Sequence, residues 1–139
     1  MLEFEEYKTK LNYVAPDLEE LGKALNLDAI AQELDMLQAE SGSDGFWDNV
    51  EKAQKIQQRV KQLSDKIEKQ EKRQEALSDL YTLCEMGAEE GDPSLVEELE
   101  EGYDALVAEI EEAKLATLLT GQYDRYNAIL TNHPGAGGT

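Results

Sequence analysis

The stretch from Ala53 to Cys84, AQKIQQRVKQLSDKIEKQEKRQEALSDLYTLC, decides the fold of this chain of 139 residues. Steps of three and four residues alternate between its inward positions, as in the heptads of a coiled coil. These positions are Ala53, Ile56, Val60, Leu63, Ile67, Gln70, Gln74, Leu77, Tyr81 and Cys84. The spacing predicts one long helix with a narrow apolar seam, which two glutamines interrupt.

A second long helix is predicted after a turn bracketed by Gly87 and Gly91, with Asp92 as N-cap and Pro93 at the first helical position. Its apolar stripe is Val96, Leu99, Tyr103, Leu106, Ile110, Ala113 and Thr117. Because only about five residues join the two helices, we expect a long antiparallel, coiled-coil-like hairpin.

A turn centred near Glu89 would place Lys69 opposite Glu109 and Lys66 opposite Glu112. Eight of the thirteen basic residues lie in the segment from Lys52 to Arg73, here called the basic stripe. The segment from Glu85 to Glu112 contains twelve acidic residues and no basic residue. Two interpretations of the basic stripe stay open. It steers a partner, or it is a solvated helix face balanced by neighbouring acids.

Shorter helices are predicted before the hairpin. Pro16 indicates a break, so the first 25 residues form two short helical pieces. The first is expected to bury Leu2, Phe4, Tyr7, Leu11 and Val14. Residues 27–40 form a third helix, packed on the end of the hairpin, whose apolar residues recur every three or four positions: Ile30, Leu34 and Leu37.

A capping box is predicted at the start of the long helix, with Asp48 as N-cap and Glu51 three residues later. Phe46 or Trp47 would act as a hydrophobic staple at this helix entry. The alternative for these two aromatic residues is an anchor that contacts a partner.

The C-terminal sequence departs from the helical pattern. From Leu118 the run LLTGQYDRYNAILTNHPGAGGT leaves the helix at Gly121, reads as a short strand over residues 127–131 and ends on glycines. A strand needs a neighbour, and nothing else in the chain reads as one. We therefore expect a fragment with an all-α domain over residues 1–120, followed by a linker and a strand-like tail over residues 121–139.

Composition favours a helical, reduced, cytoplasmic protein. The chain is 32% charged and 6% aromatic, and it has one cysteine, no signal sequence and no long apolar run. Its 31 acidic and 13 basic residues give a net charge of −18, which opposes binding to a phosphate backbone.

No chemistry is predicted for the chain itself. His133 is the only histidine, Cys84 is expected to be a buried small hydrophobe, and the turn over residues 135–138 lacks the ending of a phosphate-binding loop. We expect no catalytic residues, cofactor or metal, and hence no enzyme.

Two islands of sequence carry a family resemblance. Gly121, Tyr123, Asp124, Ala128 and Leu130, with the turn Gly135-Ala136-Gly137-Gly138-Thr139, resemble the bacterial class I peptide chain release factors. Phe46-Trp47-Asp48-Asn49, followed by Glu51, Lys52, Ala53 and Gln54, resembles the branch of that family that reads UGA and UAA. The resemblance spans residues 27–139, whereas Val50 stands where the family often has proline.

The resemblance implies the N-terminal helical domain of a factor that recognises stop codons on the ribosome and triggers hydrolysis of peptidyl-tRNA. The Gly-Gly-Gln and Ser-Pro-Phe tripeptides that serve these steps in the family are missing from the sequence. Missing domains would contact mRNA and rRNA, and this domain would dock at the base of the ribosomal stalk. The release factor glutamine methyltransferase is a further implied partner.

The residues expected to contact a partner are Phe46, Trp47, Glu97, Glu98, Glu100 and Glu101. The fragment is expected to be a monomer without a membrane anchor. An alternative function is a free-standing acidic coiled-coil adaptor, which would dimerise through its seam. An enzyme is the weakest alternative, because no convergent polar residues are evident.

Overall fold

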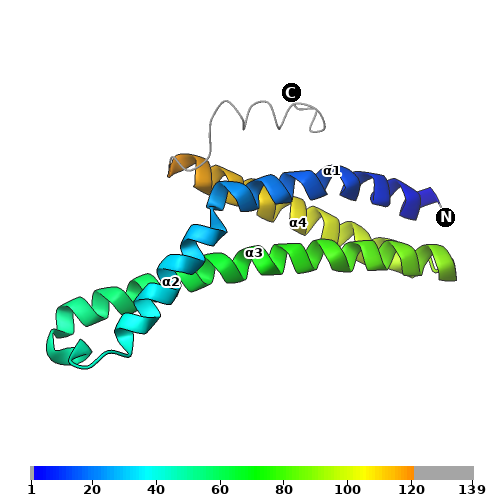
Figure 1. Ribbon diagram of the computed structural model, residues 1–139. Coiled ribbons are helices and arrows are strands. Elements are labelled where there is room, and N and C mark those ends of the chain that lie inside the picture. Colours follow the sequence, from blue (N-terminus) through cyan, green and yellow to red (C-terminus); the bar gives the residue numbers. More distant parts are fainter. Residues whose placement is uncertain (1, 121–139) are drawn as a thin grey trace. The chain divides into compact units, whose positions relative to one another are not determined.

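The computed structural model describes residues 2–120, and all of its regular structure is helical (Figure 1). The elements are α1 (Leu2–Leu25), α2 (Leu27–Ser41), the short 3-10 helix η1 (Phe46–Asp48), α3 (Val50–Glu90) and α4 (Ser94–Leu119). The all-α prediction is confirmed for this part of the chain. The predicted strand and the domain boundary after residue 120 concern residues 121–139, which lie outside the described residues, and both stay predictions.

The chain divides into two compact units. The first, called the three-helix unit, comprises α1, the last part of α3 from Lys72, and α4. The second, called the two-helix unit, comprises residues 26–71 with α2, η1 and the first part of α3. The prediction of one long hairpin involves residues of both units and stays a prediction.

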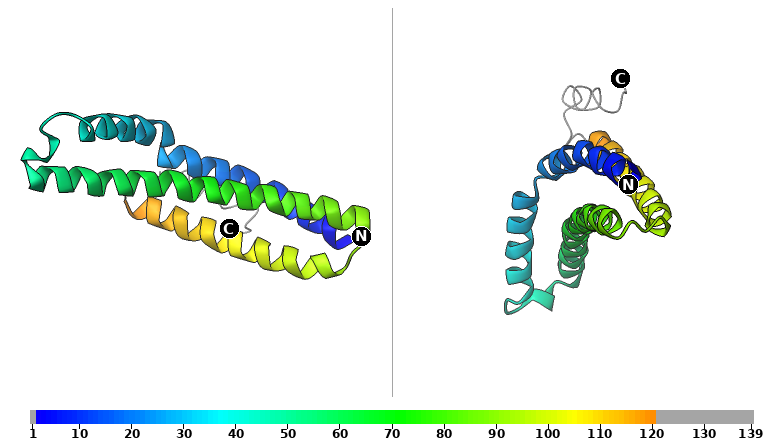
Figure 2. Two further views of the ribbon diagram at one scale, coloured as in Figure 1. Left: turned by 90° about the horizontal axis from the view of Figure 1, so that it is seen from below. Right: turned by 90° about the vertical axis from the view of Figure 1, so that its right-hand side faces the viewer.

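In the three-helix unit, α1 packs along α4 (Figure 2). Tyr7 meets Tyr103 and Asp17 meets Lys114, so these two helices run in the same direction. Glu109 accepts a hydrogen bond from Arg73, so α3 also packs against α4. The buried apolar residues of this unit are Phe4, Leu11, Val14, Leu18, Leu21, Leu25, Leu80, Cys84, Leu99, Leu106 and Ile110.

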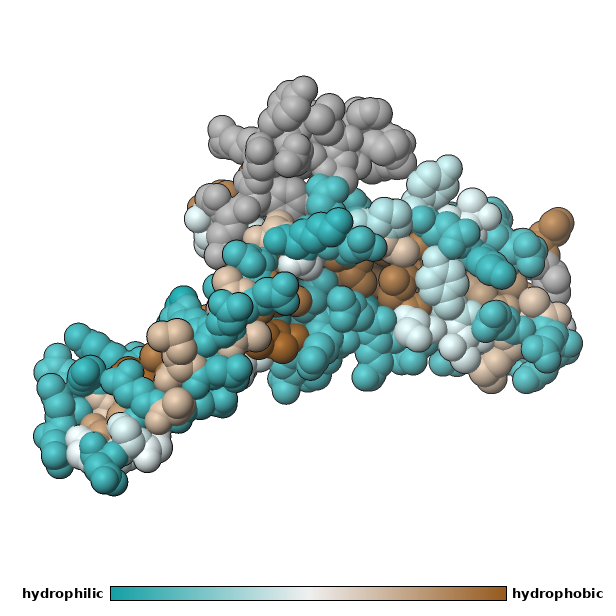
Figure 3. All heavy atoms as spheres, in the orientation of Figure 1, coloured by the Kyte–Doolittle hydropathy of each residue, from teal (hydrophilic) through white to brown (hydrophobic). Residues whose placement is uncertain are grey.

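Figure 3 shows a largely hydrophilic face, with apolar atoms gathered in the seam between α1 and α3. The predicted stripe of α4 is confirmed at Leu99, Leu106, Ile110 and Thr117, all of which are buried. The seam of α3 is displaced in this unit, where Arg73 and Leu80 are buried in place of the predicted Gln74 and Tyr81. Within this unit Glu109 pairs with Arg73.

The predicted break at Pro16 is wrong, because α1 continues through it to Leu25. Proline removes one helical hydrogen bond, but the buried positions Leu11 and Val14 before it and Leu18 and Leu21 after it keep a helical period. Their burial outweighs the local loss. The inward placement of Leu2 is also wrong, since this residue is 84% exposed.

In the two-helix unit, α2 begins after Asn26, whose φ of 54° is tolerated by asparagine in the left-handed region. The predicted helix over residues 27–40 is confirmed, although Ile30 is its only buried residue among those described. Ala53 and Leu63 of α3 are the other buried apolar side chains of this unit.

The N-cap of α3 was predicted one residue too early. Asp48 belongs to η1, and Asn49 instead accepts a hydrogen bond from the N–H of Lys52 at 3.1 Å through its side-chain oxygen. Asparagine is as good a cap as aspartate, so the sequence signal was ambiguous here.

At the other end of α3, Gly87 lies inside the helix and does not bracket the turn. A Cβ atom at this position would collide with the ring of Phe4, so glycine is needed for α1 to approach. The turn centres on Gly91, which has a φ of 62°. The N-cap of α4 is Pro93, one residue later than predicted, and Asp92 in the turn before it accepts hydrogen bonds from the N–H and the hydroxyl of Ser94.

Candidate functional site

The predicted acidic contact residues lie together at the start of α4, and they are here called the acidic face: Glu97, Glu98, Glu100 and Glu101. All four are exposed. The helix turns its opposite side, with Leu99 and Leu106, into the core of the three-helix unit, so its carboxylates point to solvent. The acidic face is therefore an exposed helical surface of one charge sign.

One member of the acidic face is tied to α1. The hydroxyl of Tyr7 donates to Glu100 at 3.5 Å, and the Tyr7 ring packs edge-on against Tyr103 with centroids 5.4 Å apart. The ammonium of Lys10 lies 4.6 Å from the Tyr7 ring centroid, within cation–π range. Burial and then the charges of Glu100 and Asp104 raise the pKa of Tyr7. Glu97, Glu98 and Glu101 form no ion pair with another described residue.

The predicted aromatic contact residues lie on η1, in the two-helix unit, and are here called the aromatic pair: Phe46 and Trp47. Their rings meet edge to face with centroids 5.2 Å apart. Trp47 is 57% exposed, whereas Phe46 is half-buried. A staple at this helix entry would bury its apolar residue, so the exposure of Trp47 argues against that role for it.

Polar bridges hold the turn that carries the aromatic pair. Arg59 on α3 donates two hydrogen bonds to Glu33 on α2, at 2.8 and 2.9 Å. Nearer the turn, Lys52 and Glu40 form an ion pair at 3.6 Å. The hydrogen bond from Arg59 lowers the pKa of Glu33. These bridges connect α2, which precedes the turn, to α3, which follows it.

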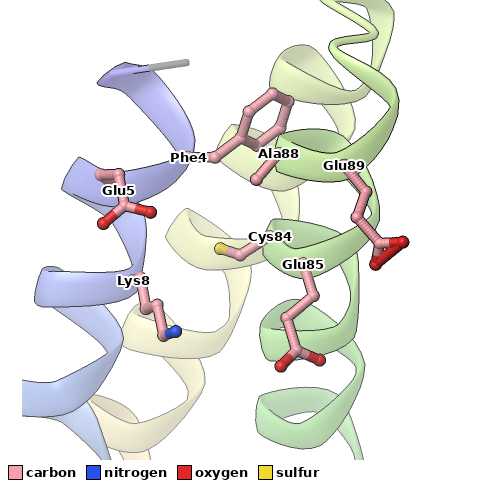
Figure 4. A pocket seen from close by; sticks show the side chains of 7 residues that line it. All are labelled: Phe4, Glu5, Lys8, Cys84, Glu85, Ala88 and Glu89. Carbon is pink, nitrogen blue, oxygen red and sulfur yellow. The ribbon is translucent and has the colours of Figure 1, made fainter.

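A groove between α1 and the end of α3 was not predicted (Figure 4). It is lined by Phe4, Glu5, Lys8, Cys84, Glu85, Ala88 and Glu89, all from the three-helix unit. The lining residues of α1 and those of α3 are about 80 positions apart in the sequence, so no local pattern predicts the groove. Only Gly87 was a usable signal, as a glycine within a helix often marks a close approach.

The floor of the groove is apolar. Phe4 and Cys84 are 1% and 2% exposed. Burial raises the pKa of the Cys84 thiol, and Glu5 and Glu85 raise it further while Lys8 opposes them. The thiol is thus protonated at neutral pH and unreactive, as expected for a buried small hydrophobe.

No group of acidic, histidine or cysteine side chains in residues 2–120 is arranged to hold a metal ion. Among the helices described, none combines the length and apolar character needed to cross a bilayer. His133 and the turn over residues 135–138 lie outside the described part of the chain, so the predictions about them stay predictions.

Comparison with known proteins supplies the family. Residues 30–139 match the PCRF domain. Over 139 residues the chain is 37% identical to peptide chain release factor 2 of Clostridium perfringens strain SM101 and 32% identical to that of Petrotoga mobilis. It is also 32% identical over 138 residues to the release factor 2 of Lactiplantibacillus plantarum.

These alignments take in 99–100% of this chain but only 37–38% of each relative. The chain therefore spans little more than a third of the length of the curated relatives that it matches. No solved structure matches it. Because the PCRF match covers most of the chain, and release factor 2 sequences align with all or nearly all of it, the protein belongs to the PCRF domain family of the peptide chain release factors.

Proposed function

We propose that this chain is the docking and positioning part of a cytoplasmic translation termination factor of the release factor 2 type. The complete factor would recognise UGA and UAA codons and trigger peptidyl-tRNA hydrolysis through domains beyond this chain, which would contact mRNA and rRNA. The observation that carries the proposal is the alignment of the whole chain with release factor 2. The chain itself would have no catalytic role.

The acidic face supports docking onto protein rather than RNA. Its four exposed carboxylates, in a chain with a net charge of −18, are repelled by the phosphates of rRNA. Basic protein surfaces attract the same charges and speed productive encounters. We therefore propose that Glu97, Glu98, Glu100 and Glu101 meet basic proteins at the base of the ribosomal stalk.

The aromatic pair supports a second contact. Trp47 is a large exposed side chain on a turn that ion pairs and hydrogen bonds hold in place, and tryptophan is enriched among residues that dominate binding energy. We propose that Trp47, backed by Phe46, anchors the two-helix unit to a partner in the termination complex. The glutamine methyltransferase of release factors is a second candidate for this contact.

A chimaera tests the docking proposal. The matching region of the Clostridium perfringens release factor 2 is replaced by this chain, and release of a labelled peptide is measured on ribosomes stalled at UGA, UAA or UAG. Activity on UGA and UAA alone is expected. Inactivity of a folded chimaera on all three codons would count against the assignment to release factor 2.

Charge-neutral variants of the chimaera then test the acidic face. Glu97→Gln, Glu98→Gln and Glu101→Gln together are expected to raise the KM for ribosomes about three- to tenfold with kcat unchanged, because uniform binding is lost. Glu100 is spared because Tyr7 binds it. The control removes three exposed charges elsewhere in the same unit, by Glu3→Gln, Glu75→Gln and Asp79→Asn. An equal rise in KM for the control would contradict a local docking face.

A free-standing acidic adaptor is the alternative, favoured by the heptad spacing of α3. It predicts a dimer at micromolar concentration, whereas the docking proposal predicts a monomer. Sedimentation equilibrium of the 139-residue chain separates the two. A stable dimer that is inactive in the chimaera would favour the adaptor.

A further inference from the structure

The groove between α1 and α3 combines an apolar floor with a charged rim (Figure 4). Phe4 and Cys84 form the buried floor. Glu5 and Lys8 rise from α1, and Glu85 and Glu89 rise from α3, so four exposed charged side chains border the same hollow. Three of the four are carboxylates.

The rim is negative and unbalanced. None of Glu5, Lys8, Glu85 and Glu89 forms a side-chain ion pair with another described residue. The last turn of α3 contains no basic residue, so the negative end of its helix dipole adds to the charges of Glu85 and Glu89. Lys8 is the only cation of the rim, so the four side chains together carry a net charge of −2.

The shape of the site selects an extended organic cation. These carboxylates are not arranged to hold a metal ion. Glu85 and Glu89 are four residues apart on α3, so their Cβ atoms lie about 6 Å apart along one helix face. Their two carboxylates are therefore within reach of a single planar guanidinium group. The aliphatic stem of the same side chain could lie along Ala88, which lines the groove and is exposed, as long cationic side chains often cover apolar surface.

We propose that this groove binds an arginine-bearing segment of a partner protein, with the guanidinium group between Glu85 and Glu89 and the hydrocarbon stem of the arginine beside the exposed Ala88. The inference deepens the proposed function, on which it rests for its biological setting, by naming the chemistry that the partner presents. The groove is distinct from the acidic face, which lies on α4.

Calorimetric titration of the 139-residue chain with a blocked peptide tests the proposal. The peptide carries two arginines around a leucine, and its control carries citrulline, which has nearly the same shape without the charge. Binding of the arginine peptide alone is expected, with amide NMR shifts gathered at residues 4–8 and 84–89. Equal binding of the citrulline peptide, or shifts centred elsewhere, would overturn the proposal.

Substitutions at the rim are expected to change the affinity for the arginine peptide in opposite directions. Glu85→Gln with Glu89→Gln is expected to weaken binding of the arginine peptide about three- to tenfold, since exposed ion pairs contribute modestly to binding. Lys8→Met keeps the hydrocarbon stem, removes the competing cation, and is expected to tighten binding two- to fivefold.

A chain of this charge attracts any cationic peptide, so a matched control is essential. Glu75→Gln with Asp79→Asn removes the same two charges from exposed positions of α3 away from the groove. It is expected to leave binding within twofold. If this control weakened binding equally, or if Lys8→Met weakened it, the net charge of the chain would explain the effect and the proposal would be overturned.

The outcome is separable from that of the proposed function. If the rim variants change peptide affinity in the expected directions but the chimaera is inactive, the proposal for the groove stands and the proposed role in termination fails. An active chimaera that binds neither peptide would do the reverse. Circular dichroism of each variant identifies any that fail to fold, for which Glu89→Gln alone supplies the test.

Discussion

The two units of this protein are held together by different means. The three-helix unit buries eleven apolar side chains, whereas the two-helix unit buries three: Ile30, Ala53 and Leu63. Between α2 and α3 the two-helix unit relies on exposed bridges such as Arg59–Glu33 and Lys52–Glu40. Burial of apolar area is the larger source of free energy, and exposed ion pairs contribute little. We therefore expect the three-helix unit to be the more stable part of the protein and the two-helix unit the less stable part.

The largest effect is expected from the core of the three-helix unit. Leu11 is fully buried, so Leu11→Ala should lower the free energy of unfolding by about 2–5 kcal/mol, measured by urea denaturation. In the same helix, Leu2→Ala should change it by less than about 0.5 kcal/mol, because Leu2 is 84% exposed. For the half-buried Leu34 of the two-helix unit, truncation to alanine should cost about 1 kcal/mol. A larger loss of unfolding free energy for Leu34→Ala than for Leu11→Ala would show that the two-helix unit is the more stable one.

The next effect concerns the approach of α1 to α3. Gly87→Ala places a methyl group against the buried ring of Phe4. Overpacking costs about 1–3 kcal/mol, and the better helix propensity of alanine offsets up to about 1 kcal/mol. We expect a net loss of about 1–2 kcal/mol in thermal or urea unfolding.

A second substitution identifies the cause. Phe4→Leu makes room for the methyl group, so Gly87→Ala should cost less in the Phe4→Leu background than alone. Additive losses would mean that the two side chains do not meet.

A smaller effect is expected from Asp17, whose side chain lies 3.4 Å from the buried ammonium of Lys114. Burial raises the pKa of Asp17 and outweighs the lowering by Lys114, and Glu111 and Glu20 add to the rise. Folded Asp17 thus holds its proton at higher pH than the unfolded chain does. The free energy of unfolding should fall as pH rises from the unfolded pKa to the folded pKa.

Asp17→Asn should flatten this part of the stability curve, measured by urea denaturation between pH 3 and 7. The control is Glu19→Gln, at an exposed position of the same helix. If the slope survives in Asp17→Asn, its source is another carboxyl group.

The smallest effect is expected from the bridge of the two-helix unit. Glu33→Gln weakens the exposed contact with Arg59, so α2 should exchange its amide hydrogens slightly faster at low salt. At about 1 M salt the difference should vanish, because screening already weakens the pair. Asp35→Asn removes the same charge from an exposed position of α2 and should have no such effect. A salt-independent effect of Glu33→Gln would show that geometry rather than charge holds α2.

Local signals in the sequence predicted much of the helical structure. The 3.6-residue period predicted the buried stripe of α4, and the turn residues Gly91 and Asp92 located its start to within one residue. The same reasoning failed at Pro16, where burial on both sides maintains the helix, and at Arg73 and Leu80, where the partner helices select the inward face. Periodicity limits a face to within one residue, and packing decides between neighbours.

The candidate sites show the same division. The acidic face and the aromatic pair were named from the sequence because each is a run of adjacent residues, and the structure adds which side chains are exposed or tied to a neighbour. The groove escaped sequence reasoning, since its two walls come from helices joined only by tertiary contacts.

By itself, then, the sequence determined the helical class, most helix boundaries, the acidic charge and the family, because composition, periodicity and motifs are properties of neighbouring residues. Only the tertiary structure decided that α1 runs through Pro16, that Phe4 needs a glycine at position 87, and that Glu5 and Lys8 share a groove with Glu85 and Glu89. The physical reason is that burial and close contact between distant segments outweigh local helix propensities, which are at most about 1 kcal/mol for most residues and about 3 kcal/mol for proline.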